Sequence, residues 1–369
     1  MYTKNLTVGV FTHDFFPFIG GQGRHIYQMY QQNLLHKKTS MVVFSPAKNS
    51  LPNHVQLFPE TGRSKLKNIE YSWKLNNIFE KLIEQYRLDL VHIHGGPGGL
   101  FLLKKLSVPV VYTTHHTYWQ QYSYIRTQRW KYLLYVLEKQ SYRYADEIIC
   151  VSTDTQQILS KYYQVEKPYL HYIPNGIEQK NSIFANTNTY KKAKDILYVG
   201  RIDKRKGVDF LLKSMVSVNK IDPDIRLHIV GTGKDKDELE YFSVHYNLPV
   251  TFYNHVSDQD LQKIYTKVSA QIVPSIFEGF GISILEGMAN GVPIIATNVD
   301  GIRSIVKHNY SGILVPYNDH DALADAIVYL LANSSIQKQL LTNAYRELPK
   351  YNWQKSYFQT VQLYEKIIH

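Results

Sequence analysis

The chain has 369 residues, of which 44% are hydrophobic and 20% charged, and its formal net charge at pH 7 is +11. This length suits two domains with full-sized cores. A single cysteine excludes a disulfide framework, and no apolar run approaches the ~20 residues that a transmembrane helix needs. We find no secretory leader pattern at the start and therefore expect a cytoplasmic protein. The basic excess is greater in the first half, which favours an anionic partner there, either a membrane surface or nucleic acid.

Short apolar runs alternate with helical-looking segments along the whole chain. In the first half these runs lie at 6–12, 41–44, 90–93, 108–112, 148–151 and 172–173. After a polar stretch at 178–194 the pattern restarts, with runs at 196–199, 227–230, 250–253, 270–273, 292–296 and 313–315. This alternation predicts parallel, doubly wound sheets. We expect an α/β protein with two tandem Rossmann-like domains, an N-terminal one at 1–178 and a C-terminal one at 179–352.

A glycine-rich loop, F-I-G-G-Q-G-R-H, follows the first predicted strand and contains Gly20, Gly21 and Gly23. The dinucleotide fingerprint G-x-G-x-x-G fails here, because Ile26 stands at the third glycine position and the next strand region lacks an acidic residue for a ribose. Glycines still allow backbone to approach a ligand closely. The loop is therefore a candidate for phosphate or sugar contact, with a merely tight turn as the alternative.

Two histidines, His94 and His115, stand at the C-terminal ends of predicted strands. Ligands of open α/β sheets bind at that edge, so both are candidates for a site. For His94, a structural hydrogen bond to backbone is an equal alternative. Because adjacent residues at a strand end point apart, the pair His115–His116 does not predict a metal site, and we expect none.

The segment 118–145 is basic and rich in tyrosine. Helical spacing predicts that one face, Trp130, Leu133, Leu134 and Leu137, is turned to the core. A second stripe consists of Tyr132, Tyr135, Lys139 and Tyr142, with Arg126, Arg129, Lys131 and Arg143 nearby. Tyrosine beside cations suits a membrane interface, and a solvated helix face is the alternative. The chain has no zinc spacing, helix-turn-helix or RNA-binding motif, so nucleic acid is not the expected partner.

The first loop of the second half, V-G-R-I-D-K-R-K-G, follows the strand predicted at 196–199. Arg201 and Lys206 of this loop are candidate ligands of phosphate oxygens. A guanidinium can donate two parallel hydrogen bonds to them, and an ammonium acts as a point charge. Lys204 and Arg205 fit a solvated basic loop.

The stretch 274–291, P-S-I-F-E-G-F-G-I-S-I-L-E-G-M-A-N-G, carries two glutamates eight positions apart. We expect a loop and then a helix that begins near Ile282, with free N–H groups that favour an anion. The residues predicted to line this anion slot are Gly279, Phe280, Gly281 and Ile282. Glu286 would accept from ribose hydroxyls and Glu278 from a second sugar; a structural glutamate bonded to backbone is the alternative.

Together these motifs resemble those of the retaining family-four glycosyltransferases with the GT-B architecture. The shared features, in order, are Gly20-Gly21, His115, Ile173-Pro174-Asn175-Gly176, Val199-Gly200-Arg201…Lys206-Gly207 and Glu278…Glu286. The resemblance implies a cleft between two Rossmann-like domains, with a C-terminal helix at 353–369 packed back on the first domain.

The resemblance also implies roles for the residues. Arg201 and Lys206 would hold the donor diphosphate, while Glu286 would bind ribose. Glu278 would bind the donor sugar, and His115 would contact that sugar near the reacting carbon. Gly20 and Gly21 would line the diphosphate side of the cleft.

The expected activity is transfer of a sugar, with retained configuration, from a nucleotide diphosphate sugar to an acceptor hydroxyl, without cofactor or metal. The acceptor is expected to be a lipid-linked or cell-envelope glycan at the inner face of the cell membrane. The alternatives are a sugar-nucleotide epimerase of the same fold and a non-catalytic nucleotide-sugar-binding protein. Ser304 stands where the family commonly has Glu, which leaves the sugar open. The nucleotide base, the linkage and the oligomeric state are open as well.

Overall fold

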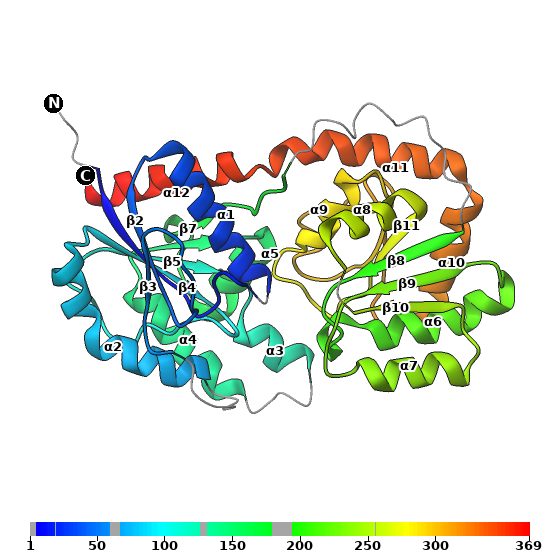
Figure 1. Ribbon diagram of the computed structural model, residues 1–369, viewed down its shortest axis with the longest axis horizontal. Coiled ribbons are helices and arrows are strands. Elements are labelled where there is room, and N and C mark those ends of the chain that lie inside the picture. The colour runs from blue at the N-terminus through cyan, green and yellow to red at the C-terminus, as the bar shows by residue number, and fades with distance from the viewer. Residues whose placement is uncertain (1–4, 19, 60–66, 126–130, 179–193, 255) are drawn as a thin grey trace. The chain divides into compact units, whose positions relative to one another are not determined.

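The computed structural model describes residues 5–18, 20–59, 67–125, 131–178, 194–254 and 256–369. The chain divides into two compact units (Figure 1). Unit 1 contains Met1–Gly176 and Trp353–His369, and unit 2 contains Ile177–Asn352. No helix among the described residues combines the length and the apolar character that crossing a membrane requires.

Unit 1 is built on a seven-stranded sheet of order β3-β2-β1-β4-β5-β6-β7, in which every pairing is parallel. Its strands are β1 Thr7–Phe11, β2 Ser40–Ser45, β3 His54–Gln56, β4 Leu90–Gly95, β5 Val110–Thr114, β6 Glu147–Cys150 and β7 Leu170–Tyr172. Its helices are α1 Gly21–His36, α2 Lys67–Tyr86, α3 Tyr118–Tyr124, α4 Tyr132–Tyr144, α5 Thr153–Ile158 and α12 Trp353–Ile368, with a π-helical turn at Leu159–Tyr163 and a 3-10 turn at Lys167–Tyr169.

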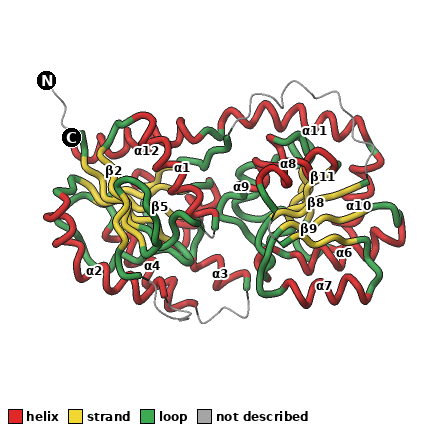
Figure 2. Tube along the Cα trace, viewed as in Figure 1, coloured by secondary structure: helices red, strands yellow, loops and turns green. Residues whose placement is uncertain are grey.

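The strands of this sheet send alternate side chains into two apolar layers. Val8 and Val10 of β1 pack in the layer that contains α1 and α12. Phe11 packs in the other layer, against Phe79 of α2. Because both faces are covered by helices (Figure 2), the strands read as continuous apolar runs in the sequence.

The last helix, α12, belongs to unit 1 although unit 2 precedes it in the sequence. It lies beside α1 (Figure 1). Trp353, Tyr357 and Val361 form an apolar cluster with Met29 of α1. These three residues recur at four-residue spacing, which places them on one face of the helix.

Unit 2 has a six-stranded sheet of order β10-β9-β8-β11-β12-β13, again with parallel pairings throughout. Its strands are β8 Asp195–Val199, β9 Arg226–Val230, β10 Val250–Tyr253, β11 Ala270–Val273, β12 Ile294–Thr297 and β13 Ile313–Val315. Its helices are α6 Val208–Ile221, α7 Lys236–His245, α8 Asp258–Lys267, α9 Ile282–Ala289, α10 His320–Ala332 and α11 Ser334–Glu347, with 3-10 turns at Lys204–Lys206 and Leu348–Lys350.

In both sheets the strand order reverses next to the first strand. In unit 1 the reversal lies between the neighbouring strands β1 and β4, and in unit 2 it lies between β8 and β11. In open α/β sheets the loops that follow such a pair of strands diverge to opposite faces, and ligands bind at that carboxyl edge. Gly20 follows β1, Arg201 and Lys206 follow β8, and Glu278 follows β11, so these candidates lie in such loops. His94 lies near the end of β4, His115 follows β5, and Glu286 lies on α9.

Two details of unit 1 differ from the expectation. Strand β3 was missed, because its three residues carry no apolar run. On α4, Leu134 is buried as expected, but Leu133 is 72% exposed and Tyr142, which was expected in the second stripe, is buried. The inner face consists of Leu134, Glu138, Ser141 and Tyr142, because the helix begins at Tyr132 and these positions repeat at helical spacing.

Candidate functional site

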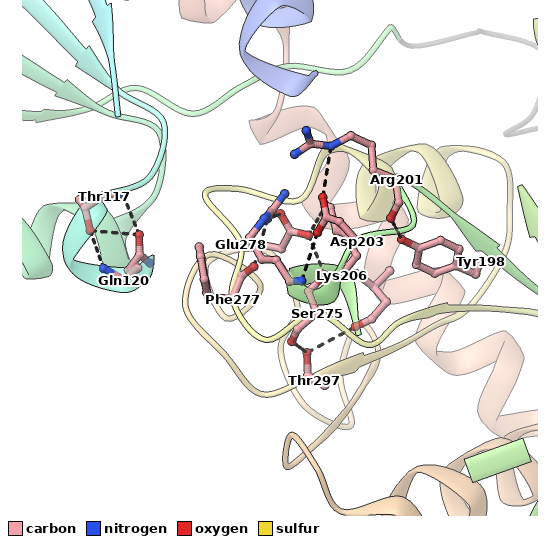
Figure 3. A network of polar contacts seen from close by, with 12 residues as sticks. Thr117, Gln120, Tyr198, Arg201, Asp203, Lys206, Ser275, Phe277, Glu278 and Thr297 are labelled. Atoms are coloured by element: carbon pink, nitrogen blue, oxygen red, sulfur yellow. Dashed lines mark hydrogen bonds and ion pairs between the residues drawn. The ribbon is translucent and has the colours of Figure 1, made fainter. Parts of the chain in front are cut away.

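The centre of the unit 2 site is the carboxylate of Glu278, which is 6% exposed (Figure 3). Its Oε1 accepts hydrogen bonds from Lys206 Nζ and from Ser275 Oγ, the latter at 2.7 Å. Its Oε2 accepts from Arg205 at 3.2 Å. Burial alone would raise the pKa of Glu278, but Lys206 and Arg205 outweigh that effect and lower the pKa to about 2. The group is therefore a permanent anion at physiological pH.

Three loops at the carboxyl edge of the sheet are joined around this carboxylate. The backbone N–H of Glu278 donates to Asp300 O at 3.0 Å, and the N–H of Ile276 donates to Arg205 O at 2.8 Å. Thr297, the last residue of β12, donates its hydroxyl to Ser275 O at 2.5 Å. Loops that follow β8, β11 and β12 thus hold each other by main-chain hydrogen bonds, which fixes the position of Glu278.

Gly207 explains how the first two loops come so close. Its φ is +68°, a left-handed conformation that disfavours other residues, and it ends the turn Lys204–Lys206. A Cβ at this position would lie 2.0 Å from the carbonyl oxygen of Pro274. The glycine therefore allows the two backbones to touch, so that the cations of one loop reach the carboxylate of the other.

The cations predicted for the diphosphate have different surroundings in the structure. Lys206 is bound to Glu278, with its side chain 17% exposed. Arg201 is 52% exposed, and its Nε lies 3.7 Å from Asp203. The expectation that Arg205 is solvated was wrong: its side chain is 13% exposed, packs over the Phe277 ring and also donates to Phe277 O. The sequence K-R-K does not indicate that Arg205 is partly buried and Lys204 exposed. This difference arises because the short turn at Lys204–Lys206 directs Lys204 outward.

The glycine loop and helix after Glu278 follow the expected plan. Gly281 has φ +98°, and α9 begins at Ile282. Phe280 is buried and packs edge-on against Tyr351, so its side chain belongs to the apolar core of the loop. Glu286 is half-buried on α9, whereas its neighbours Leu285 and Gly287 are buried.

Unit 1 carries a second group of candidates, a cluster of buried histidines. His94 is the last residue but one of β4, and its Nδ1 lies 3.2 Å from Nε2 of His115, which follows β5. His25 of α1, which the sequence analysis did not select, has its ring 5.0 Å from that of His115. All three are at most 6% exposed. His25 is the last residue of the F-I-G-G-Q-G-R-H motif and lies near the start of α1, and this position beside the glycines is its local signal in the sequence.

A hydrogen-bond partner fixes His25. Its Nδ1 lies 2.7 Å from Oδ1 of Asn175, within the I-P-N-G motif. Burial lowers the pKa of His25 to about 4, against the opposing effect of the Asn175 bond. Burial likewise lowers the pKa of His94 and His115 well below the ordinary value. The three imidazoles are therefore neutral at pH 7.

The glycine loop of unit 1 is organised by Asp14, another residue that the sequence analysis did not select. Its Oδ2 accepts from the backbone N–H groups of Gly20 and Gly23, each at 3.1 Å. A Cβ at Gly23 would lie 2.6 Å from the Asp14 carboxyl carbon. Two backbone N–H groups of the loop that was expected to approach a phosphate or sugar thus already have a carboxylate of the chain as acceptor.

The residues predicted for the membrane side lie partly outside the described ones. Arg126 and Arg129 fall there. Lys131 donates to Gln121 and Lys139 donates to Gln164, the latter at 2.8 Å. Tyr135 is half-buried and donates its hydroxyl to Tyr162 O, so of the described tyrosines in the set only Tyr132, 49% exposed, faces outward.

Both halves of the chain match models of known protein families. Residues 19–180 match the family model for Glycosyltransferase Family 4, and residues 179–347 match the model for Glycosyl transferases group 1. A phosphatidyl-myo-inositol mannosyltransferase of Mycobacterium leprae is 30% identical over 199 residues, which cover 53% of this chain and 53% of that protein.

Solved structures resemble the whole fold. The sucrose-phosphate synthase of Thermosynechococcus elongatus superposes with a TM-score of 0.80 at 23% identity, over 98% of this chain and 99% of that one. The HepE protein of Anabaena, in complex with UDP and glucose, gives a TM-score of 0.73 at 16% identity, over 98% and 100%. With both halves matched by their family models and the two-sheet architecture shared, the chain belongs to the family-four glycosyltransferases of the GT-B fold.

Proposed function

We propose that the protein transfers a sugar, with retained configuration, from a nucleotide diphosphate sugar to an acceptor hydroxyl. The observation that carries the proposal is the buried Glu278 carboxylate held by Lys206 and Arg205 at the carboxyl edge of the unit 2 sheet. The solved relative that holds UDP and glucose supports a donor of this class.

Glu278 suits recognition of a donor sugar hydroxyl. An ionised carboxylate offers about four acceptor positions, and three are used by Lys206, Ser275 and Arg205. The remaining position on Oε2 accepts one hydroxyl of the sugar. Because its pKa is about 2, Glu278 does not hold a proton at neutral pH and so is not the acid or base of the reaction.

The chemical step breaks the bond between the anomeric carbon and the diphosphate oxygen, and it leaves negative charge on the diphosphate. Lys206, Arg201 and the first N–H groups of α9 stabilise that charge as it develops. In this proposal these cations supply the charge that a metal ion supplies elsewhere, so no cofactor or metal takes part in the chemical step. The leaving phosphate takes the proton of the attacking hydroxyl on the same face of the sugar, which retains the configuration. His115 contacts the sugar near the reacting carbon through Nδ1, because its Nε2 faces Nδ1 of His94.

The acceptor in this proposal is a lipid-linked or cell-envelope glycan, reached by peripheral binding of the protein to the inner face of the cell membrane. On the outward face of α4, Tyr132, Leu133 and Val136 are 49%, 72% and 47% exposed, and Arg143 is exposed beside them. Apolar side chains next to cations bind well at an anionic interface. The relative named for phosphatidyl-myo-inositol supports an acceptor with a lipid part.

The test is release of nucleoside diphosphate from UDP-, GDP- and ADP-sugars, with and without a bacterial lipid extract. We expect release from one donor that requires the lipid extract. Glu278→Ala should lower the rate by roughly 10²–10³, the usual loss when one preorganised electrostatic contact is removed. Asp260→Ala is the matched control, because Asp260 is an exposed carboxylate paired with Lys263, and its rate should be unchanged.

Other outcomes select the alternatives. Conversion of a donor sugar to an isomer without diphosphate release indicates an epimerase. Tight nucleotide binding without any release indicates a binding protein. Release that needs no lipid keeps the transferase and removes the membrane acceptor.

Membrane binding itself is tested by co-sedimentation with vesicles that contain anionic lipid. Leu133→Ser combined with Val136→Ser should lower the bound fraction, and so should substitution of Arg126, Arg129 and Lys131 by Ser. Leu35→Ser is the control, since Leu35 is equally exposed, at 71%, but lies on α1. Equal sedimentation of all variants contradicts membrane binding through α4.

A further inference from the structure

The histidine cluster of unit 1 has the composition of a transition-metal site. His25, His94 and His115 each offer one ring nitrogen, and these three atoms lie within 4.8 Å of one another. The residues come from α1, from the end of β4 and from the residue after β5, so three rigid elements converge on one point. We propose that this cluster binds one transition-metal cation of the Zn²⁺ class, contrary to the sequence expectation of no metal site.

The distances require little rearrangement. Zn–N bonds of 2.0–2.1 Å in a tetrahedral site place ligand nitrogens about 3.3 Å apart. His94 Nδ1 and His115 Nε2 already lie 3.2 Å apart. The third nitrogen lies no more than 4.8 Å from either, so a side-chain adjustment of about 1.5 Å completes a three-histidine site. A fourth position is left for water or another ligand.

An outer hydrogen bond orients the third ligand. Histidines that bind metals donate their other ring N–H to a fixed acceptor, which sets the tautomer and the ring direction. The Nδ1 of His25 has this partner in Oδ1 of Asn175, at 2.7 Å. That bond leaves Nε2 of His25 for the metal. The ring is also held by edge-on packing against Trp353.

The neighbouring histidine shows what a non-ligating member of the cluster looks like. His92 stacks on His94, but its two ring nitrogens are engaged, by the Tyr364 hydroxyl at 2.5 Å and by the Thr113 hydroxyl at 2.7 Å. His92 is therefore excluded as a fourth ligand.

The donor set also defines the class of metal. Among the described residues the cluster contains three imidazoles and no carboxylate. Imidazole nitrogen suits Zn²⁺, Cu²⁺ and Ni²⁺, whereas Mg²⁺ and Ca²⁺ require oxygen ligands. The site should therefore discriminate strongly between these two groups of cations.

The test uses the full chain, stripped of metal with a chelator and then equilibrated with Zn²⁺ against a chromogenic competitor. One Zn²⁺ should bind per chain, and excess Mg²⁺ or Ca²⁺ should not displace it. Co²⁺ should give the visible absorption band of a tetrahedral nitrogen site. Because the cluster is buried, a second sample is unfolded and refolded with Zn²⁺ present, so that slow entry is not mistaken for absence of a site.

Variants locate the metal. His25→Ala should abolish stoichiometric binding, and Asn175→Ala should weaken it by about 10–100-fold, the loss typical of an outer-shell partner. His245→Ala is the control, because His245 is an exposed histidine on α7, and its affinity should equal that of the wild type. His25→Gln replaces His25→Ala if circular dichroism shows that the alanine variant does not fold.

Two results overturn the proposal. One is the absence of bound Zn²⁺ in both the equilibrated and the refolded samples, which leaves His94 and His115 as a simple hydrogen-bonded pair. The other is stoichiometric binding that survives both substitutions of His25. Neither result depends on sugar transfer, so failure here is distinct from failure of the proposed activity.

Discussion

The side chain of Glu278 stays ionised although it is buried. The free energy of a buried carboxylate is unfavourable unless cations and hydrogen-bond donors compensate for the lost water. Here a lysine, an arginine and a serine do so from two loops. The compensation works in both directions, because removing the carboxylate leaves Lys206 and Arg205 without their anion.

The first prediction concerns stability and pH. Glu278→Gln should lower the free energy of unfolding by about 3–5 kcal/mol at pH 7, the usual cost of breaking a buried ion pair. The folded pKa, about 2, is below the ordinary value of 4.5. Ionisation therefore favours the folded state above pH 4.5, and this contribution is lost as the pH falls towards 2.

The free energy of unfolding of wild type and Glu278→Gln is measured by urea denaturation of the full chain at several pH values. The gap between wild type and Glu278→Gln should be constant from pH 5 to 7 and should narrow below 4.5. A gap that is independent of pH down to 2.5 would refute the assignment of the low pKa to Glu278.

The second prediction compares adjacent cations of one turn. Arg205→Ala should lower the rate of donor cleavage by at least about tenfold, because one of the two cations that orient Glu278 is lost. Lys204→Ala should not change that rate, since Lys204 is exposed. Steady-state kinetics for both variants make the comparison, and equal rates would show that Arg205 has no role in placing Glu278.

Among the elements of unit 1, α3 and α4 are linked by one buried acid. Oε2 of Glu138, on α4, accepts from the backbone N–H of Tyr118 at the start of α3 and from the Tyr163 hydroxyl. Oε1 is buried and has no hydrogen-bond partner among the described residues. Burial raises the pKa of Glu138 to about 8, despite the opposing hydrogen bonds. At pH 7 the acid is therefore mainly protonated in the folded state.

The third prediction follows from this raised pKa. Because the folded state holds the proton more tightly than the unfolded state, stability should fall by about 1.4 kcal/mol per pH unit between the ordinary value of 4.5 and 8. Glu138→Gln should remove this part of the pH dependence and should be the more stable protein at pH 8.5. Thermal melts of both proteins from pH 5 to 9 provide the measurement. Parallel curves across this range would contradict a protonated Glu138.

The elements also show what the sequence could and could not predict. The continuous apolar strands of both sheets were found, since strands covered on both faces leave a strong signal. Strand β3 was missed because its pairing with β2 depends on backbone hydrogen bonds and not on apolar residues. The prediction of which face of α4 is buried was partly wrong, because a glutamate and a tyrosine occupy buried positions whereas Leu133 is exposed.

For the whole molecule, the motifs predicted the family but not the partners within each site. Glu278 and Lys206 were each selected, yet nothing in the sequence indicated that they bind each other across 72 positions. Likewise His94 and His115 were selected separately, and His25 was missed, because convergence of three elements depends on the folded sheet. Contacts over such distances follow from topology, and local spacing does not contain them.

The fourth prediction separates the two units by their stability. Tyr357 of α12 is buried and donates its hydroxyl to Asn33 of α1. Tyr357→Ala should lower the melting transition of unit 1, at a cost of about 3–5 kcal/mol. Gln362→Ala, at an exposed position of the same helix, should have no effect. Calorimetry with and without nucleoside diphosphate assigns the transitions, because the ligand should raise only that of unit 2. The prediction is contradicted if the chain shows one melting transition, and if both Tyr357→Ala and the nucleoside diphosphate shift it. The two units would then unfold together.

The return of α12 to unit 1 has a consequence for how such chains can be rebuilt. Since unit 1 uses both ends of the chain, unit 2 is an insertion bounded by two junctions, near 176–177 and 352–353. Unit 2 is thus a cassette that can be exchanged between relatives by recombination at those two points. A crossover at the first junction alone would pair a foreign α12 with the resident α1, so chimaeras made that way should fail in unit 1 while double-crossover chimaeras fold.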